Sequence, residues 1–197
     1  MRRPLVALLS ILSVGCAATH TVERIPVGSG PLFGVYKADV DDGGGTRRHA
    51  KISLWAEPPD RLHAEFLGPM GGVAFILDAG GGKACVIDLS AATAYAGDDG
   101  VDAIESLVGV RVTVADAVAA LLTGTAPSGL SVSRSGDASG SLPDAVRIED
   151  GSRSVLLTRV KLVRGAGDPA SLGTGVPPAK FQVAPLAHLP PAALSER

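Results

Sequence analysis

The chain has 197 residues, enough for one domain with a substantial hydrophobic core. Its formal net charge is −2 and aromatic residues make up only 4% of it, so it offers no basic patch interleaved with aromatic side chains, and we expect no nucleic-acid partner. The 25 glycines and 14 prolines provide for many turns, which favours many short strands over long helices.

The N-terminus has the parts of an export signal. Two arginines at residues 2–3 precede an apolar segment at residues 5–12, which is too short to span a bilayer. The sequence Ser-Val-Gly-Cys at residues 13–16 resembles the lipobox of bacterial lipoproteins. This resemblance implies that residues 1–15 are a signal peptide and that Cys16 is lipidated after cleavage. The alternative is an ordinary secretory signal that contains a cysteine.

The segment after the signal predicts a tether. Residues 16–31 contain prolines and glycines and show no hydrophobic periodicity, so we expect a flexible link between Cys16 and the folded domain. Ala17 follows the cysteine. In enterobacterial lipoproteins an aspartate at that position retains the protein in the inner membrane. Its absence therefore implies a lipid-anchored protein in the outer membrane, facing the periplasm.

Six segments with strand character come next. They lie at residues 33–40, 48–57, 61–67, 73–77, 83–89 and 93–96. Glycines and prolines between consecutive segments mark turns, one of them at residues 78–82. Six strands joined in this way predict an antiparallel meander. Trp55 falls on the polar face of its strand, so we expect it at an opening or an edge of the sheet.

The turn between the third and fourth strands carries an unusual residue. Met70 is a large apolar side chain where polar residues are the rule, and glycines and a proline surround it. Two interpretations stay open. The side chain either meets lipid or an acyl chain, or it folds back against the sheet and fills a gap.

The hydrophobic period then changes from that of strands to that of helices. Asp99 can cap a first helix, and Thr113 can cap a second, with Asp116 three residues later as in a capping box and Gly124 as the end. Each helix has one apolar face, which consists of Val101, Ile104, Leu107 and Val108 in the first and of Val114, Ala117, Val118, Leu121 and Leu122 in the second.

Strands resume after the helices and are followed by a region rich in glycine and proline. We predict strands at residues 130–134, 145–149 and 153–163. In the last of these, one face is expected to carry Leu156, Val160 and Leu162. Residues 165–178 are expected to be irregular, and residues 180–184 to add one edge strand before a proline-rich, mobile tail.

Three motifs occur in order within residues 35–163. They are Leu67-Gly68-Pro69-Met70-Gly71 between two strands, the helix pair from Asp98 to Gly124, and Leu142-Pro143 before a strand. Their order and spacing resemble LolB, the outer-membrane lipoprotein receptor that takes lipoproteins from the periplasmic carrier LolA.

The alternation and the resemblance lead to one expected fold. The pattern predicts a mainly β chain of the α+β class, with two helices covering one face of a curved sheet. The resemblance implies an incomplete antiparallel β-barrel with a two-helix lid in residues 32–164, and a Gly/Pro-rich C-terminal extension in residues 165–197.

The resemblance also implies a binding site. The lid would enclose a hydrophobic cavity for the acyl chains of lipoproteins, and the loop of Gly68, Pro69, Met70 and Gly71 would insert into the membrane. Met70 occupies the place of a leucine that in LolB helps to hand lipoproteins to the membrane. The cavity candidates are inward-facing apolar residues, namely Ile52, Leu54, Leu62, Phe66, Phe75, Ile104, Leu107, Val118 and Leu121. Their pattern alone is equally that of an ordinary core.

We expect no enzyme, cofactor or metal site. The sequence has no Gly-x-Ser-x-Gly elbow, HExxH motif, phosphate loop or CxxC pair. Cys85 alternates with Ile87 on a predicted strand, so we interpret it as a small core residue. His63 and Glu65 share a strand face that we expect to be solvated. The remaining ligands of a calcium loop are missing around the acidic cluster of Asp39, Asp41 and Asp42.

Two functions from different classes remain. The first is a monomeric outer-membrane lipoprotein that binds acyl chains and helps to insert lipoproteins, with a LolA-like carrier as partner. The second is a non-enzymatic structural or assembly partner in the outer membrane. It would have the same fold with a filled core and would grip another protein with its outer face or its tail.

Overall fold

A computed structural model describes residues 31–68, 70–98, 100–126, 128–136, 142–162 and 172–190. The predicted signal peptide, the lipidated Cys16 and the tether up to residue 30 lie outside the described residues. So do Pro69 of the predicted membrane loop and Asp99, the predicted cap of the first helix.

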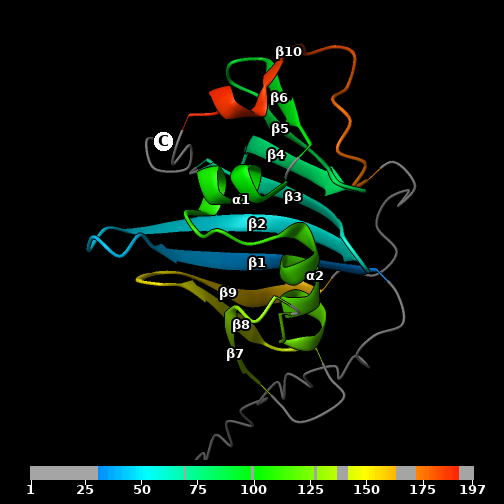
Figure 1. The fold of residues 1–197 in the computed structure, drawn as a ribbon. Helices are drawn as coiled ribbons and strands as arrows, with labels where there is room; N and C mark the ends of the chain where they lie inside the picture. The colour runs from blue at the N-terminus through cyan, green and yellow to red at the C-terminus, as the bar shows by residue number, and fades with distance from the viewer. Residues whose placement is uncertain are drawn as a thin grey trace, which may run out of the picture.

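The described residues form one ten-stranded sheet, in the order β10-β6-β5-β4-β3-β2-β1-β9-β8-β7. Its strands are β1 (Leu32–Asp41), β2 (Arg47–Glu57), β3 (Arg61–Leu67), β4 (Val73–Gly80), β5 (Lys83–Asp88), β6 (Thr93–Gly97), β7 (Ser131–Ser135), β8 (Ala145–Asp150), β9 (Arg153–Leu162) and β10 (Gln182–Pro185). The sheet is curved and open (Figure 1). Strands hold 50% of the described residues and helices 15%, which confirms the predicted mainly β fold and incomplete barrel.

The first six strands form the predicted meander, because each pairs antiparallel with its neighbours in the chain. The turn predicted at residues 78–82 begins later than expected. Asp78 still belongs to β4, and the chain reverses at Gly81 and Gly82, which have φ angles of 59° and 76°. These are left-handed backbone angles that glycine adopts at little cost. The last strand, β10, differs from the others because it pairs parallel with β6.

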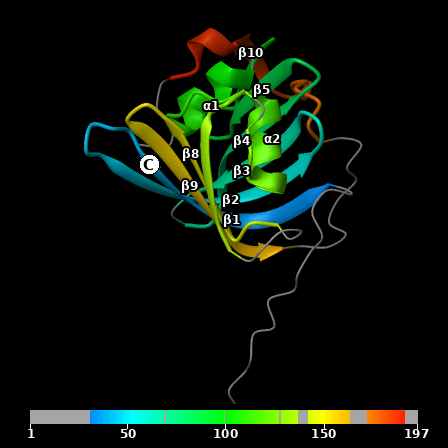
Figure 2. The same ribbon diagram turned by 60° about the horizontal axis from the view of Figure 1, so that its bottom comes forward.

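Two helices lie inside the curve of the sheet, as Figure 2 shows. They are α1 (Gly100–Val108), which packs on β4 and β5, and α2 (Val114–Thr123), which packs on β2, β3 and β8. The predicted ends of α2 are confirmed. Thr113 Oγ1 accepts a hydrogen bond of 3.0 Å from the backbone N–H of Asp116, and Gly124 ends the helix with a φ of 71°.

The face predicted for β9 is wrong. Val160 is 61% exposed, and the buried residues of β9 that face the core are Val155 and Leu157. Of the three predicted residues only Leu162, which lies beyond an irregularity in the strand pairing, packs against the core. The pairing of β1 with β9 shifts between Val35 and Tyr36, so that Val160 has no partner opposite it. A β-bulge inserts one extra residue, so the residues on its two sides no longer follow one continuous alternation between the faces of the sheet. A prediction that assumes strict alternation along the whole strand therefore places some residues on the wrong face.

The segment at residues 172–176 covers the convex face of the sheet at the ends of β3, β4 and β5 that carry Arg61, Gly80 and Lys83. Trp55 points to this side and is buried, not placed at an opening as expected. The Arg61 guanidinium lies 5.0 Å from the centre of its ring, and a side-chain carbon at Gly173 would come within 3.0 Å of it. Glycine is therefore required there for the segment to approach the indole closely.

The described part of the C-terminal region is part of the fold and not a mobile tail. The predicted edge strand is present as β10, and a 3-10 helix, η2 (Leu186–His188), follows it. Leu186 and Leu189 are buried in the main hydrophobic core, where η2 packs against β6 and α1. The sequence did not indicate this because only two apolar side chains, set among prolines, carry the contact.

Candidate functional site

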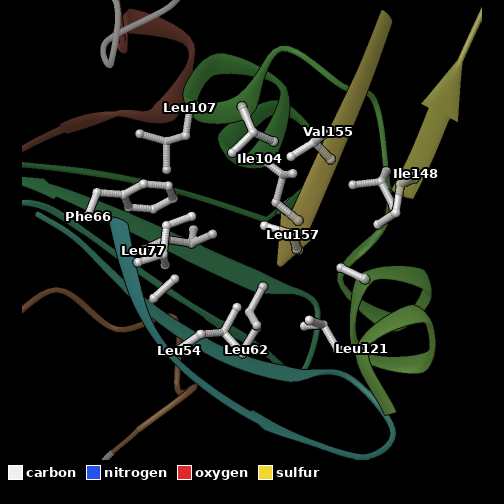
Figure 3. Close-up of a pocket in the computed structure, with 15 residues that line it drawn as sticks. Leu54, Leu62, Phe66, Leu77, Ile104, Leu107, Leu121, Ile148, Val155 and Leu157 are labelled. Carbon is white, nitrogen blue, oxygen red and sulfur yellow. The ribbon is translucent and has the colours of Figure 1, made fainter. Parts of the chain in front are cut away.

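An apolar cavity of about 50 Å³ lies between the concave face of the sheet and the two helices (Figure 3). All the side chains that line it are aliphatic or aromatic. The strands contribute through alternation, since every second residue of β2 and β3 points inward, and α1 contributes residues one turn apart. The cavity therefore lies between the apolar face of the sheet and the apolar faces of the two helices.

Most of the predicted cavity residues line this space. They are Ile52, Leu54, Leu62, Phe66, Ile104, Leu107 and Leu121. The other two, Phe75 and Val118, are buried in the same core but do not line the cavity.

Sequence reasoning missed the remaining lining residues. They are Ala64, Leu77, Val108, Val112, Ala117, Ile148, Val155 and Leu157. The last three form a wall contributed by β8 and β9, which reach the cavity because β9 pairs with β1 at the far side of the meander. Alternation in β8 could have indicated Ile148, whereas the bulge in β9 concealed the side on which Val155 and Leu157 lie.

The size of the cavity limits what it can hold in the state described. An apolar cavity of about 150 Å³ accommodates benzene. The cavity here is about 50 Å³, which is too small for an acyl chain. The cavity is partly open, but it can take up a longer part of a chain only if a helix moves away from the sheet, so the contacts that hold the helices decide how much chain is bound.

Ion pairs attach α1 to the end of the β8–β9 hairpin. Glu105 on α1 accepts a hydrogen bond of 2.7 Å from Arg153 of β9 and one of 3.0 Å from Arg111, which follows the helix. Arg153 also binds Asp150 at 2.6 Å. The hydrogen bond from Arg153 is the main reason why the pKa of Glu105 lies below its ordinary value. This cluster, which we call the α1 clamp, consists of partly exposed charges that water can replace.

The loop between β3 and β4 presents Met70 to solvent. The backbone N–H of Gly68 donates to the carbonyl of Gly72 over 2.7 Å, and the N–H of Gly71 donates to the carbonyl of Gly68 over 2.9 Å. Gly71 has a φ of 82°, which closes the turn. The Met70 side chain is 100% exposed, so the interpretation that it folds back and fills a gap is wrong.

A second polar site, which the sequence did not indicate, lies on the convex face. The Asp78 carboxylate accepts hydrogen bonds from the backbone N–H groups of Gly173, Thr174 and Gly175 at 2.6 to 3.0 Å. His63 Nδ1 lies 2.9 Å from the same carboxylate, so His63 is not on a solvated face as expected. Burial raises the pKa of Asp78, but the hydrogen bonds from His63 and the backbone outweigh this and hold it below the ordinary value.

The chemistry available to the other singled-out residues is limited. Cys85 is fully buried, and burial together with the charge of Asp78 raises the pKa of its thiol to about 11, so it is protonated at neutral pH. Asp41 and Asp42 accept hydrogen bonds from backbone N–H groups of their own turn. Among the described residues, no group of three or more His, Cys, Asp or Glu side chains could hold a metal ion.

Two further findings bear on identity. None of the helices in the described ranges is both long enough and apolar enough to pass through a lipid bilayer. In comparisons with known proteins, no family model and no curated protein matches this sequence. The features of the chain that bear on its function are therefore the cavity, the loop that carries Met70 and the charges around α1.

Proposed function

We propose that this protein is a lipid-anchored outer-membrane protein that binds acyl chains of lipoproteins in the cavity under α1 and α2 and helps to insert lipoproteins into the outer membrane. The observation that carries the proposal is the wholly apolar cavity between an open, curved sheet and two helices. The resemblance of the sequence motifs to LolB supports the same function, with a LolA-like carrier as the donor.

Such a site can bind its ligand without a covalent step, because burial of the apolar chain supplies the binding free energy. Burying an apolar chain stabilises the complex by about 0.8 kcal/mol per methylene, so half of a typical acyl chain already provides useful affinity. Part of this energy is spent on displacing α1 or α2, because the cavity in the described state has a volume of only about 50 Å³. Reclosing of the helices, in competition with the bilayer, would then release the chain.

The α1 clamp provides a first test of this mechanism. Replacing Glu105 with glutamine removes the charge that Arg111 and Arg153 share, so α1 should leave the sheet more often. Partly exposed pairs are each worth up to about 1 kcal/mol, so we expect uptake of a fluorescent fatty acid to accelerate about two- to fivefold in stopped-flow measurements. Glu65→Gln on the convex face is the control. Equal uptake rates in all three proteins would contradict entry beneath α1.

Met70 provides a second test. Met70→Glu places a charge on a fully exposed apolar tip that, in this proposal, contacts the bilayer. Loss of the apolar burial of one such side chain, about 2 kcal/mol, should reduce transfer of an acylated peptide from the protein to liposomes by at least about tenfold. Binding of the peptide should be unchanged, because the loop is not part of the cavity. Met70→Leu should transfer normally, and a normal rate for Met70→Glu would remove the loop from the mechanism.

The overall proposal is tested by native mass spectrometry of the purified protein, combined with lipid extraction. Co-purified lipid or acylated peptide, or uptake of an added fatty acid, is the expected result. A protein that stays empty with every acyl probe would refute acyl binding.

The small cavity is also the observation that favours the second candidate, a structural or assembly partner with a nearly filled core. That function would use the outer face or the tail to grip another protein, and where the tail does so, removal of the region after residue 190 should abolish the function. Acyl-chain transfer should survive this truncation, because Leu186 and Leu189, which belong to the core, are retained.

A further inference from the structure

The cationic side chain of Arg48 lies on the concave side of the sheet near the cavity. Arg48 of β2 pairs with Val40 of β1, which in turn pairs with Val155 of β9. Paired residues of neighbouring strands point to the same face, and Val40 is buried on the concave face. Val155 lines the cavity. The side chain of Arg48 therefore begins on the same inner face as the cavity residue Val155, with one strand, β1, between them.

The guanidinium of Arg48 reaches the end of α1. Its Nη2 lies 3.1 Å from the place where a side-chain carbon would stand at Gly109, the residue directly after α1. Val108, the last residue of α1, lines the cavity. Along β2 the next inward-facing cavity residue is Ile52, about 13 Å away for four residues of extended chain. Arg48 thus lies at the end of the cavity nearest the β1–β2 hairpin.

Arg48 differs from the neighbouring arginines in its hydrogen-bond partners. Arg111 and Arg153 both bind carboxylates of the α1 clamp. Within the part of the chain that the structure describes, Arg48 Nη1 is buried and has no hydrogen-bond partner. The nearby Asp42 carboxylate instead accepts the backbone N–H groups of Gly44 and Thr46. A buried N–H donor without an acceptor costs about 1–3 kcal/mol, which favours an acceptor supplied from outside the chain.

We propose that Arg48 binds the anionic head of an amphiphile whose chain occupies the apolar cavity. This inference rests on the proposed acyl-chain function and extends its ligands from the neutral ester- or amide-linked chains of lipoproteins to a free amphiphile, an acyl or alkyl chain that ends in a carboxylate or a phosphate. A guanidinium presents paired N–H groups that match both anions, and its hydrogen bonds strengthen where water is partly excluded. The separation of Arg48 from Ile52 lets the head stay at the end of the cavity while the chain runs along the inner face of β2 and β3.

A structural role for Arg48 makes a different prediction. The guanidinium lies beside the C-terminal end of α1, where a positive charge stabilises a helix by about 0.3–1 kcal/mol. If that were its whole purpose, neutralising it would lower stability and leave the relative affinities for charged and neutral ligands unchanged. Ligand selectivity therefore separates the two roles.

The experiment compares amphiphiles with the same chain and different heads. Palmitate and hexadecyl phosphate should each bind the wild-type protein at least about tenfold more tightly than hexadecanol, as a charge-assisted hydrogen bond would provide. In Arg48→Gln this preference should disappear while the affinity for hexadecanol stays the same. Arg47→Gln, which removes the same charge from an exposed neighbour, should keep the preference. The tighter of the two anions shows whether the site prefers a carboxylate head, as in a fatty acid, or a phosphate head.

The outcomes separate this inference from the function on which it rests. Equal wild-type affinities for palmitate, hexadecyl phosphate and hexadecanol would overturn the role of Arg48 and leave acyl binding intact. No binding of any of them would refute the acyl-chain function itself. The wild-type comparison needs no variant, so it stays decisive even if Arg48→Gln does not fold.

Discussion

Replacing Asp78 with alanine is expected to lower the free energy of unfolding by about 3 kcal/mol and to release the segment at residues 172–176 from the convex face. The Asp78 carboxylate binds three consecutive backbone N–H groups, the Thr174 hydroxyl and His63. Alanine would leave these donors without an acceptor in a place from which water is largely excluded. Trp55, which the same segment covers, would become exposed.

Urea denaturation and limited proteolysis measure the two effects separately. The variant should unfold at lower urea, and it should be cut within residues 172–181 under conditions in which the wild type resists. Asp98→Ala, at an exposed aspartate, should change stability by no more than about 0.5 kcal/mol. A wild-type-like cleavage pattern for Asp78→Ala would mean that the segment is held by packing and not by the carboxylate.

The same carboxylate gives stability a dependence on pH. The pKa of Asp78 is lower in the folded protein than its ordinary value, so the unfolded chain binds the proton more tightly. Its contribution is therefore fully present above the unfolded pKa of about 3.9 and is lost as the pH falls through the lower, folded value. In Asp78→Asn this component of acid destabilisation should be absent, which urea titrations between pH 3 and pH 7 can measure.

Asp78 also illustrates what the sequence could and could not predict. The alternation of β3 and the apolar run of β4 are local signals, and they predicted both strands and several of their inward residues, such as Leu62, Phe66 and Phe75. The partners of Asp78 lie 95 to 97 residues later, in a stretch of glycine, threonine and proline that has no periodic pattern. In the sequence, an aspartate that follows an apolar run and precedes glycines is typical of a turn. Only the folded structure shows that Asp78 is instead a buried hydrogen-bond acceptor.

The same distinction applies to the cavity. Ile52, Leu62 and Leu107 could be predicted as cavity residues because the hydrophobic periods of strands and helices indicate which side chains share a face. The wall from β8 and β9 depended on a long-range pairing with β1 and on the bulge at Val160, neither of which has a clear local signal. The volume left between these faces depends on how large side chains interdigitate, which pattern reasoning does not address.

Leu107→Ala is expected to lower the free energy of unfolding by about 3 kcal/mol and to make the cavity large enough for a small apolar ligand. Leu107 is fully buried on α1 and points toward Phe66 across the cavity (Figure 3). Shortening it removes apolar contacts and adds empty volume to a cavity of about 50 Å³. Leu89→Ala, the same change at a side chain that is 38% exposed, should cost less than about 1 kcal/mol.

The response of Leu107→Ala to ligands separates the two proposed functions. Benzene should raise its melting temperature and leave that of the wild type unchanged, because only the enlarged cavity accepts benzene without a movement of the helices. If the protein carries acyl chains, palmitate should stabilise both proteins. It should bind the variant at least as tightly as it binds the wild type, because the enlarged cavity requires a smaller displacement of α1. If the core is instead filled and the helices do not move, palmitate should stabilise neither protein, because the enlarged cavity still holds only a small ligand such as benzene. A wild-type protein that gains no stability from palmitate therefore argues for the assembly partner, even where the variant binds benzene.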